Sequence, residues 1–217
     1  MRKDLNLRSK TMKRWTLILG FLLVTCPRPP AWAEFTPQEW EVLKTGEVLA
    51  TEVFTPKPDG TQATDVLVKI WIKGPPEDVW KVIRDYDHFG EFMPRVRSCR
   101  ITKQDGEAYW IVYDMEVLGI QVIYNLITMG KEKYRRIEFD LDRLKPNDIR
   151  EARGYYVLDD APDGQGTVLS YSALVATGIP VPQVIARRIS KPNLIQVLKN
   201  VRQRVESGGA WKKPAGS

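Results

Sequence analysis

Apolar and polar residues alternate along most of the chain between residues 47 and 177. A period of two is typical of β-strands that bury one face. In the segment 63–73, for example, Val66, Val68 and Ile70 share one face, and Lys69 lies on the other. The alternation predicts eight strands, at residues 47–54, 63–73, 96–103, 107–117, 119–130, 133–142, 151–159 and 166–177.

Three short helices are predicted ahead of or between these strands. Thr36 and Glu39, with Pro37 between them, form the N-terminal cap pattern of a helix that ends near Gly46. A second helix begins at Pro76, and a third covers residues 88–92. Both follow the first long strand, and each is punctuated by proline or glycine.

A longer helix is predicted from the residues after Pro182 to about residue 206. Leu194, Leu198, Val201 and Val205 recur at intervals of four, three and four and place one buried stripe on it. Pro192 lies inside this segment, so we expect it to kink or split the helix after residue 190.

The turns between the later strands are short and rich in Gly and Asp, as in Gln104-Asp105-Gly106. Turns of this kind join antiparallel neighbours. A sheet with one apolar face needs a cover, and the last helix is the natural one. We therefore expect one α+β domain over residues 34–206, with a curved antiparallel sheet wrapped around a long C-terminal helix, and a flexible tail at 207–217.

The first 33 residues have the three parts of a secretory signal. Six basic residues precede an apolar run at residues 15–26, and Ala31-Trp32-Ala33 follows it. A 12-residue helix spans roughly 18 Å, whereas a hydrocarbon core is about 30 Å thick. We expect cleavage after Ala33 and a periplasmic or secreted protein. An uncleaved anchor and a lipoprotein cut before Cys26 are the alternatives.

Removing that segment changes the charge of the chain. The whole sequence has 33 basic and 27 acidic side chains, a net charge of +6. Residues 1–33 contain seven basic residues and one acid, so the remainder balances at 26 against 26. The basic isoelectric point thus belongs to the signal, and it gives no indication of nucleic-acid binding.

The exported part retains one cysteine, Cys99, and one histidine, His88. A disulfide within the chain and a zinc cluster are both excluded, and no metal or cofactor is predicted. Cys99 could act as a nucleophile only beside a base, so we interpret it as a buried, inert thiol. His88 lies in a polar turn between two short helices, where an exposed side chain is expected.

The order of elements and several motifs resemble the START-like (SRPBCC) superfamily, in particular its polyketide cyclase/dehydrase and coenzyme Q-binding members. The resemblance spans roughly residues 64–205. It rests on Pro75-Pro76-Glu77-Asp78-Val79-Trp80, Asp85-Tyr86, Phe89, Phe92-Met93-Pro94, Gly154-Tyr155-Tyr156, Gly166-Thr167, Tyr171 and the proline-led last helix. It implies a helix-grip fold with an apolar cavity between the sheet and the C-terminal helix. Asp85 matches a recurring residue, for which capping of the second short helix is the simplest explanation.

Members of this superfamily bind lipids, quinones, sterols or polyketides, and a minority catalyse cyclisation or dehydration. A curved sheet lined by tyrosines suits such a pocket, although ordinary core packing is the alternative for each residue. The predicted ligand-binding residues are Phe92, Met93, Tyr113, Tyr124, Phe139, Tyr156, Tyr171, Ile185 and Ile189. No catalytic residue is predicted.

Two loops would flank the mouth of that cavity in the resembled fold, at residues 92–94 and 178–182. Their bulky apolar residues either plug the pocket or contact a lipid. Arg187, Arg188 and Lys191 form a basic cluster near the start of the last helix. A solvated face is the default interpretation, and contact with phospholipid head groups is the second.

The sequence therefore favours an exported, monomeric carrier or sensor of a small hydrophobic ligand, with transient membrane contact. An aromatase/cyclase-like enzyme is the second hypothesis, in which tyrosines, Asp85 or Arg95 polarise a carbonyl group. A structural or partner-binding domain with a filled core is the third.

Overall fold

The computed structural model describes residues 35–56, 62–117, 119–177 and 183–214, with the backbone alone at 52–56, 62–65, 176–177 and 183–190. The predicted signal and the loop at 178–182 lie outside the described residues. The elements, in chain order, are α1 (Pro37–Leu43), β1 (Val48–Pro56), β2 (Gln62–Lys73), α2 (Pro76–Ile83), the 3-10 helix η1 (Tyr86–His88), α3 (Phe89–Phe92), β3 (Val96–Asp105), β4 (Ala108–Val117), β5 (Ile120–Glu132), β6 (Arg136–Leu141), β7 (Ile149–Asp160), β8 (Gly166–Thr177) and α4 (Gln183–Glu206).

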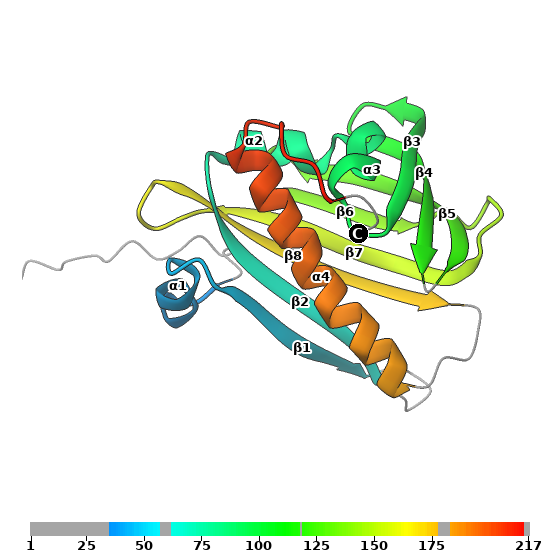
Figure 1. The fold of residues 1–217 in the computed structure, drawn as a ribbon, viewed down its shortest axis with the longest axis horizontal. Helices are drawn as coiled ribbons and strands as arrows, with labels where there is room; N and C mark the ends of the chain where they lie inside the picture. Colours follow the sequence, from blue (N-terminus) through cyan, green and yellow to red (C-terminus); the bar gives the residue numbers. More distant parts are fainter. Residues whose placement is uncertain (1–34, 57–61, 118, 178–182, 215–217) are drawn as a thin grey trace, which may run out of the picture. The chain divides into compact units, whose positions relative to one another are not determined.

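All eight strands form one antiparallel sheet in the order β1-β2-β8-β7-β6-β5-β4-β3 (Figure 1). The sheet contains seven pairs of neighbouring strands. Only the β2–β8 pair joins strands that are distant in sequence. The prediction of a curved antiparallel sheet with a C-terminal helix is thus confirmed. The long-range pairing of β2 with β8 brings the first long strand beside the last one.

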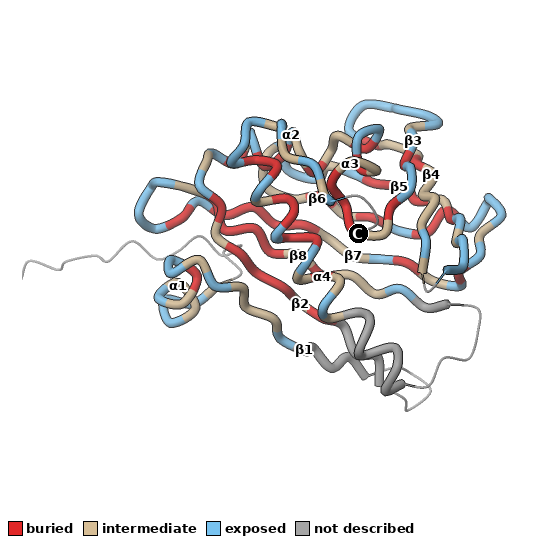
Figure 2. Tube along the Cα trace, in the orientation of Figure 1, coloured by how far each residue is buried: buried red, intermediate tan, exposed pale blue. Residues whose placement is uncertain are grey.

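The inner face of the sheet holds the main core. Alternate residues of β2, β5, β6, β7 and β8 point into it, and α4 packs on this face, chiefly against β2. Leu194, Leu198, Val201 and Val205 of α4 are all buried, which confirms the stripe read from the sequence (Figure 2).

The outer face is covered in part by α1. Thr36 and Glu39 form the predicted capping box, with Glu39 N to Thr36 Oγ1 at 3.2 Å and Thr36 N to Glu39 Oε2 at 2.7 Å. Leu43 of α1 is fully buried against Val168, and Lys69 donates a hydrogen bond to Glu39 over 2.8 Å. The N-terminal helix is therefore part of the domain.

Two local predictions need correction. Of the kink or split expected at Pro192, the split is ruled out, because α4 runs unbroken from residue 183 to 206. Pro192 is exposed, and its missing N–H leaves one helix carbonyl without a backbone donor. Asp85 does not cap a backbone N–H of η1, because its carboxylate contacts Nδ1 of His88 at 2.6 Å instead.

The segment after α4 returns to α3. Trp211 packs against the main core, and its carbonyl accepts a hydrogen bond from Arg204 over 2.8 Å. Lys213 donates from Nζ to the carbonyls of Met93 and Val96, each over 2.8 Å. Burial lowers the pKa of this lysine. These contacts, which the Gly- and Lys-rich composition did not suggest, involve part of the predicted flexible tail.

Candidate functional site

Two stacked pairs of tyrosines line the inner face of the sheet. Tyr113 of β4 is directly opposite Tyr124 of β5, and Tyr156 of β7 is directly opposite Tyr171 of β8. Directly opposed residues bring their side chains together. The ring centroids accordingly lie 5.2 Å apart in the first pair and 4.3 Å apart in the second, and both pairs are within 4° of parallel.

Phe139 of β6 packs beside the second pair. Its ring centroid lies 6.2 Å from Tyr156 and 6.3 Å from Tyr171. The space for this ring comes from Gly154 of β7, which is opposite Phe139 in the sheet. Five of the nine predicted ligand-binding residues are therefore brought together on one surface.

Burial keeps these tyrosines in the neutral phenol form. It raises the pKa of Tyr171 to about 12, and it also raises the pKa values of Tyr113, Tyr124 and Tyr156. Mutual repulsion contributes, since ionised Tyr113 would face Tyr124, Tyr156 and Tyr171. A buried phenolate is disfavoured when its neighbours supply no positive charge. The cluster can thus offer hydrogen bonds but no phenolate base.

The inner face is closed at one end and open at the other. Along β8, Leu169 is fully buried, Tyr171 and Ala173 are half-buried, and Val175 is 52% exposed. Along β5, read from its middle toward its first residue, Leu126 is buried, Val122 is half-buried and Ile120 is 58% exposed. The gradient follows both strands toward the same end of the sheet. Apolar inner-face residues at this end are not covered by core packing.

Met115, Val122 and Ala173 were not predicted as site residues. Each lies two residues from a tyrosine, on the same face of β4, β5 or β8. Met115 accepts a hydrogen bond at its sulfur from the Tyr124 hydroxyl over 3.1 Å. The period of two that selected the tyrosines also places these residues on the inner face. On these strands the aromatic rings stand out in the sequence, whereas an aliphatic or small residue on the same face is not distinguished from ordinary core.

Phe92 and Met93 do not line an open rim. Both are buried, with Phe92 packed at 5.4 Å from Phe89 between ring centroids and Pro94 buried beside them. The Phe92 carbonyl accepts a hydrogen bond from Asn200 of α4 over 2.7 Å. Of the two sequence interpretations of this loop, filling of the interior is the one the structure favours.

Ile185 and Ile189, the remaining predicted site residues, lie in α4, but their side chains are outside the described part of the structure. The same holds for Arg187 and Arg188 of the predicted basic cluster. Lys191 is half-buried.

Of the polar residues of the enzyme hypothesis, Asp85 already has a partner. Asp85 and His88 are 40% and 55% exposed and bonded to each other, and this contact raises the pKa of His88. Arg95 is half-buried with a φ of 62°, and its carbonyl accepts a hydrogen bond from Glu116 N over 2.9 Å. Cys99 is buried, as predicted, and burial raises its pKa to about 12. An inert thiol follows from that value.

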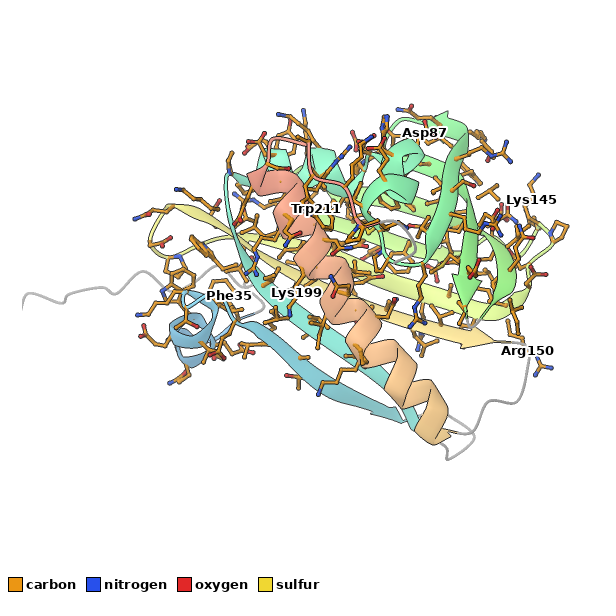
Figure 3. All side chains as sticks on the ribbon, viewed as in Figure 1. Phe35, Asp87, Lys145, Arg150, Lys199 and Trp211 are labelled. Atoms are coloured by element: carbon orange, nitrogen blue, oxygen red, sulfur yellow. The ribbon has the colours of Figure 1, made fainter. Side chains whose placement is uncertain are left out.

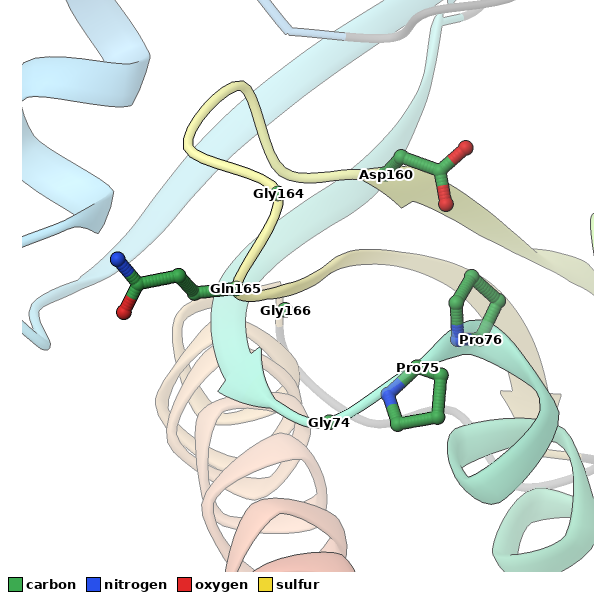
Figure 4. A pocket seen from close by; sticks show the side chains of 7 residues that line it. All are labelled: Gly74, Pro75, Pro76, Asp160, Gly164, Gln165 and Gly166. Atoms are coloured by element: carbon green, nitrogen blue, oxygen red, sulfur yellow. The ribbon is translucent and has the colours of Figure 1, made fainter.

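A separate hollow of about 320 Å³ lies between the end of β2 and the β7–β8 turn (Figure 4). Its lining is mostly glycine and proline, with Asp160 and Gln165 as the only side chains able to form hydrogen bonds. Asp160 is already paired with Arg135 over 2.7 Å. None of the four tyrosines lines this hollow, and it presents little chemistry of its own.

Within the described residues, no group of three or more His, Cys, Asp or Glu side chains is arranged to bind a metal ion. Among the helices of that same part of the chain, none is long and apolar enough to cross a membrane.

A curved antiparallel sheet with an aromatic inner face, closed by a C-terminal helix, defines a helix-grip protein of the START type. The sequence bears this out: residues 63–206 match the family described as polyketide cyclase / dehydrase and lipid transport, and the chain belongs to that family. The resemblance noted in the sequence is confirmed. A comparison with curated proteins gave no match.

Solved structures show the same fold at low sequence identity. A START superfamily protein from Mycobacterium smegmatis is 15% identical, with a TM-score of 0.58 over 66% of this chain and 97% of the other. A STAR-related lipid transfer protein from Xanthomonas axonopodis is 17% identical, with a TM-score of 0.59 over 71% and 98%. The Zhui aromatase/cyclase from Streptomyces sp. R1128 is 14% identical, with a TM-score of 0.55 over 79% and 99%.

Proposed function

We propose that this protein is an exported, monomeric carrier or sensor that holds a small hydrophobic ligand between the inner face of the sheet and α4. The burial gradient along β5 and β8 carries this proposal. Apolar and aromatic residues that face the interior stay partly exposed toward one end, where a ligand would cover them. The family description, which includes lipid transport, agrees with such a ligand.

The ligand class we propose is a lipid, a quinone or an isoprenoid-like molecule. The aromatase/cyclase alternative has less support, because the four tyrosines are held neutral and Asp85 is exposed and bonded to His88. Hydrogen-bond donors alone can orient a carbonyl group, but general acid–base chemistry needs a group that titrates near the working pH.

Native mass spectrometry of the exported form, expressed with its signal in a bacterial host, tests the proposal. We expect a cleaved monomer starting at residue 34 and carrying one co-purified ligand, which solvent extraction would release for identification. A protein that is empty and also binds no lipid or hydrophobic dye would contradict the carrier function and favour the filled-core hypothesis. Retention of the uncleaved chain would contradict export separately.

Membrane contact is proposed at the open end of the sheet. Leu144, in the loop between β6 and β7, is 93% exposed and stands between exposed Arg143 and Lys145. Figure 3 shows the Lys145 and Arg150 side chains directed outward at this end. An apolar residue flanked by cations suits the interface of an anionic bilayer.

The loop that presents Leu144 is held in place by hydrogen bonds. Asp142 accepts from Leu144 N over 3.0 Å, and Asp148 accepts from Ile123 N over 2.7 Å. Asn147 accepts from Asn125 N over 2.7 Å. The two carboxylates are thus turned toward backbone N–H groups, and the apolar tip is displayed without a partner in the described structure.

Leu144→Glu is expected to weaken binding to vesicles of phosphatidylcholine and phosphatidylglycerol by roughly ten- to hundredfold, since burying one leucine contributes about 1.5–3 kcal/mol. Co-sedimentation with the vesicles measures it. Gln165→Glu is the control, because it adds the same charge at an exposed site at the opposite end of the sheet. Equal binding by both variants and the unmodified protein would contradict membrane contact through this loop.

A further inference from the structure

The hydroxyl groups of the tyrosine cluster are not all used within the protein. The Tyr113 hydroxyl makes no hydrogen bond in the part of the chain that the structure describes, and the residue is half-buried. The Tyr124 hydroxyl donates to the sulfur of Met115, which is a weak acceptor. The inner face therefore has unused donor capacity.

The second pair of tyrosines adds to this surplus. The rings of Tyr156 and Tyr171 are stacked with their centroids 4.3 Å apart. One hydroxyl can at most donate to the other, which leaves one of the two protons unused. Tyr86, deeper in the core, shows the contrasting case. Its hydroxyl is fully enclosed and donates to Thr128 Oγ1 over 2.9 Å. The protein thus provides a hydrogen-bond acceptor of its own for this tyrosine hydroxyl, which lies too deep to reach a ligand.

The described residues that surround these hydroxyls on the inner face of β4, β5 and β6 are uncharged. The inner-face neighbours on β4 and β5 are Ile111, Met115, Val122 and Leu126, and Phe139 completes the surface from β6. A ligand carboxylate or ammonium buried there would find no counter-charge among the inner-face residues of these three strands. Burial of an unpaired charge is strongly disfavoured. A phenol that lacks a partner, in contrast, is satisfied by a carbonyl or ether oxygen.

We infer that the ligand is an uncharged apolar molecule with a hydrogen-bond acceptor, such as a ketone, quinone or ester oxygen, and that Tyr113 donates the hydrogen bond that selects it. This inference rests on the proposed carrier function and defines its ligand class. It separates carbonyl-bearing ligands from plain hydrocarbons and from fatty-acid anions.

Binding of three probes with one ring system tests it: 2-acetylnaphthalene, 2-ethylnaphthalene and 2-naphthoate, each measured by calorimetry. In Tyr113→Phe the ratio of ketone to hydrocarbon affinity should fall roughly three- to tenfold, the range for one buried hydrogen bond, with hydrocarbon affinity unchanged. The anion should bind more weakly than the ketone to both proteins.

Tyr109→Phe is the matched control. Tyr109 lies on the same face of β4, but its hydroxyl accepts a hydrogen bond from Gln104 over 3.0 Å, outside the cluster. Its affinity ratio should equal that of the unmodified protein. A ratio unaffected by Tyr113→Phe, or an anion that binds more tightly than the ketone, would overturn the inference and leave the carrier function standing. Absence of binding by all three probes, together with an empty protein in native mass spectrometry, would overturn both.

Discussion

Leu198→Ala is expected to lower the free energy of unfolding by about 2–5 kcal/mol. Leu198 is fully buried on the face of α4 that packs against the sheet, and it is among the largest side chains with no exposure. Truncation would remove its contacts and leave a cavity, because neighbouring strands of a hydrogen-bonded sheet cannot collapse into the space. For a domain of this size the melting temperature should fall by roughly 5–15 °C.

Lys199→Ala supplies the control for this change. Lys199 is the next residue of the same helix but is exposed, as Figure 3 shows. Its truncation should change the free energy of unfolding by less than about 0.5 kcal/mol. Urea denaturation of both variants measures the difference. If the two variants were equally stable, α4 would not be packed on the sheet by the stripe described here.

The elements of this fold could be predicted from the sequence, but the pairs that build the site could not. Alternation assigns Tyr113 and Tyr124 to one face of their strands, yet it does not say that they stand directly opposite each other. That depends on the register of the β4–β5 hairpin, in which Val117 is opposite Ile120. The pairing of Tyr156 with Tyr171 depends likewise on the β7–β8 turn.

The outer face shows a second limit of sequence reasoning. The cap of α1 was readable because Thr36 and Glu39 are three residues apart. The docking of α1 was not, because its partners Lys69 and Val168 lie far along the chain. Val168 gave a signal, because it is apolar although it lies on the outer face of β8, whereas Leu169 and Tyr171 lie on the inner face. An apolar residue at an outward position indicates that something covers it.

The cap at Asp85 and the split at Pro192 were mispredicted for a common physical reason. Both predictions came from local propensity, whereas the structure satisfies each group by other means. The Asp85 carboxylate takes the His88 ring as its partner. Packing of Leu194 and Leu198 keeps α4 continuous past Pro192, and one missing hydrogen bond on an exposed face does not outweigh it.

Gly154→Ala is expected to destabilise the protein by about 1–3 kcal/mol. Replacing a strand glycine by alanine ordinarily stabilises by about 0.4–1 kcal/mol, since the unfolded chain loses freedom, so the sign of the change is informative. At this position a Cβ would meet the Ser172 carbonyl oxygen at 2.1 Å and the Phe139 ring at 2.4 Å. The oxygen belongs to the β8 backbone and cannot move without opening the sheet.

The same substitution should disturb ligand binding, because Phe139 is the group that can shift. Its ring would be displaced toward Tyr156 and Tyr171, which occupy the surface proposed for the ligand. Arg153→Ala is the control: it changes the preceding residue on the outer face, where the side chain is exposed. Chemical denaturation gives the stability, and dye or probe titration gives the affinity. A Gly154→Ala protein more stable than the unmodified one would mean that β7 and β8 are farther apart at this point than described, and the second tyrosine pair would then lose its close stacking.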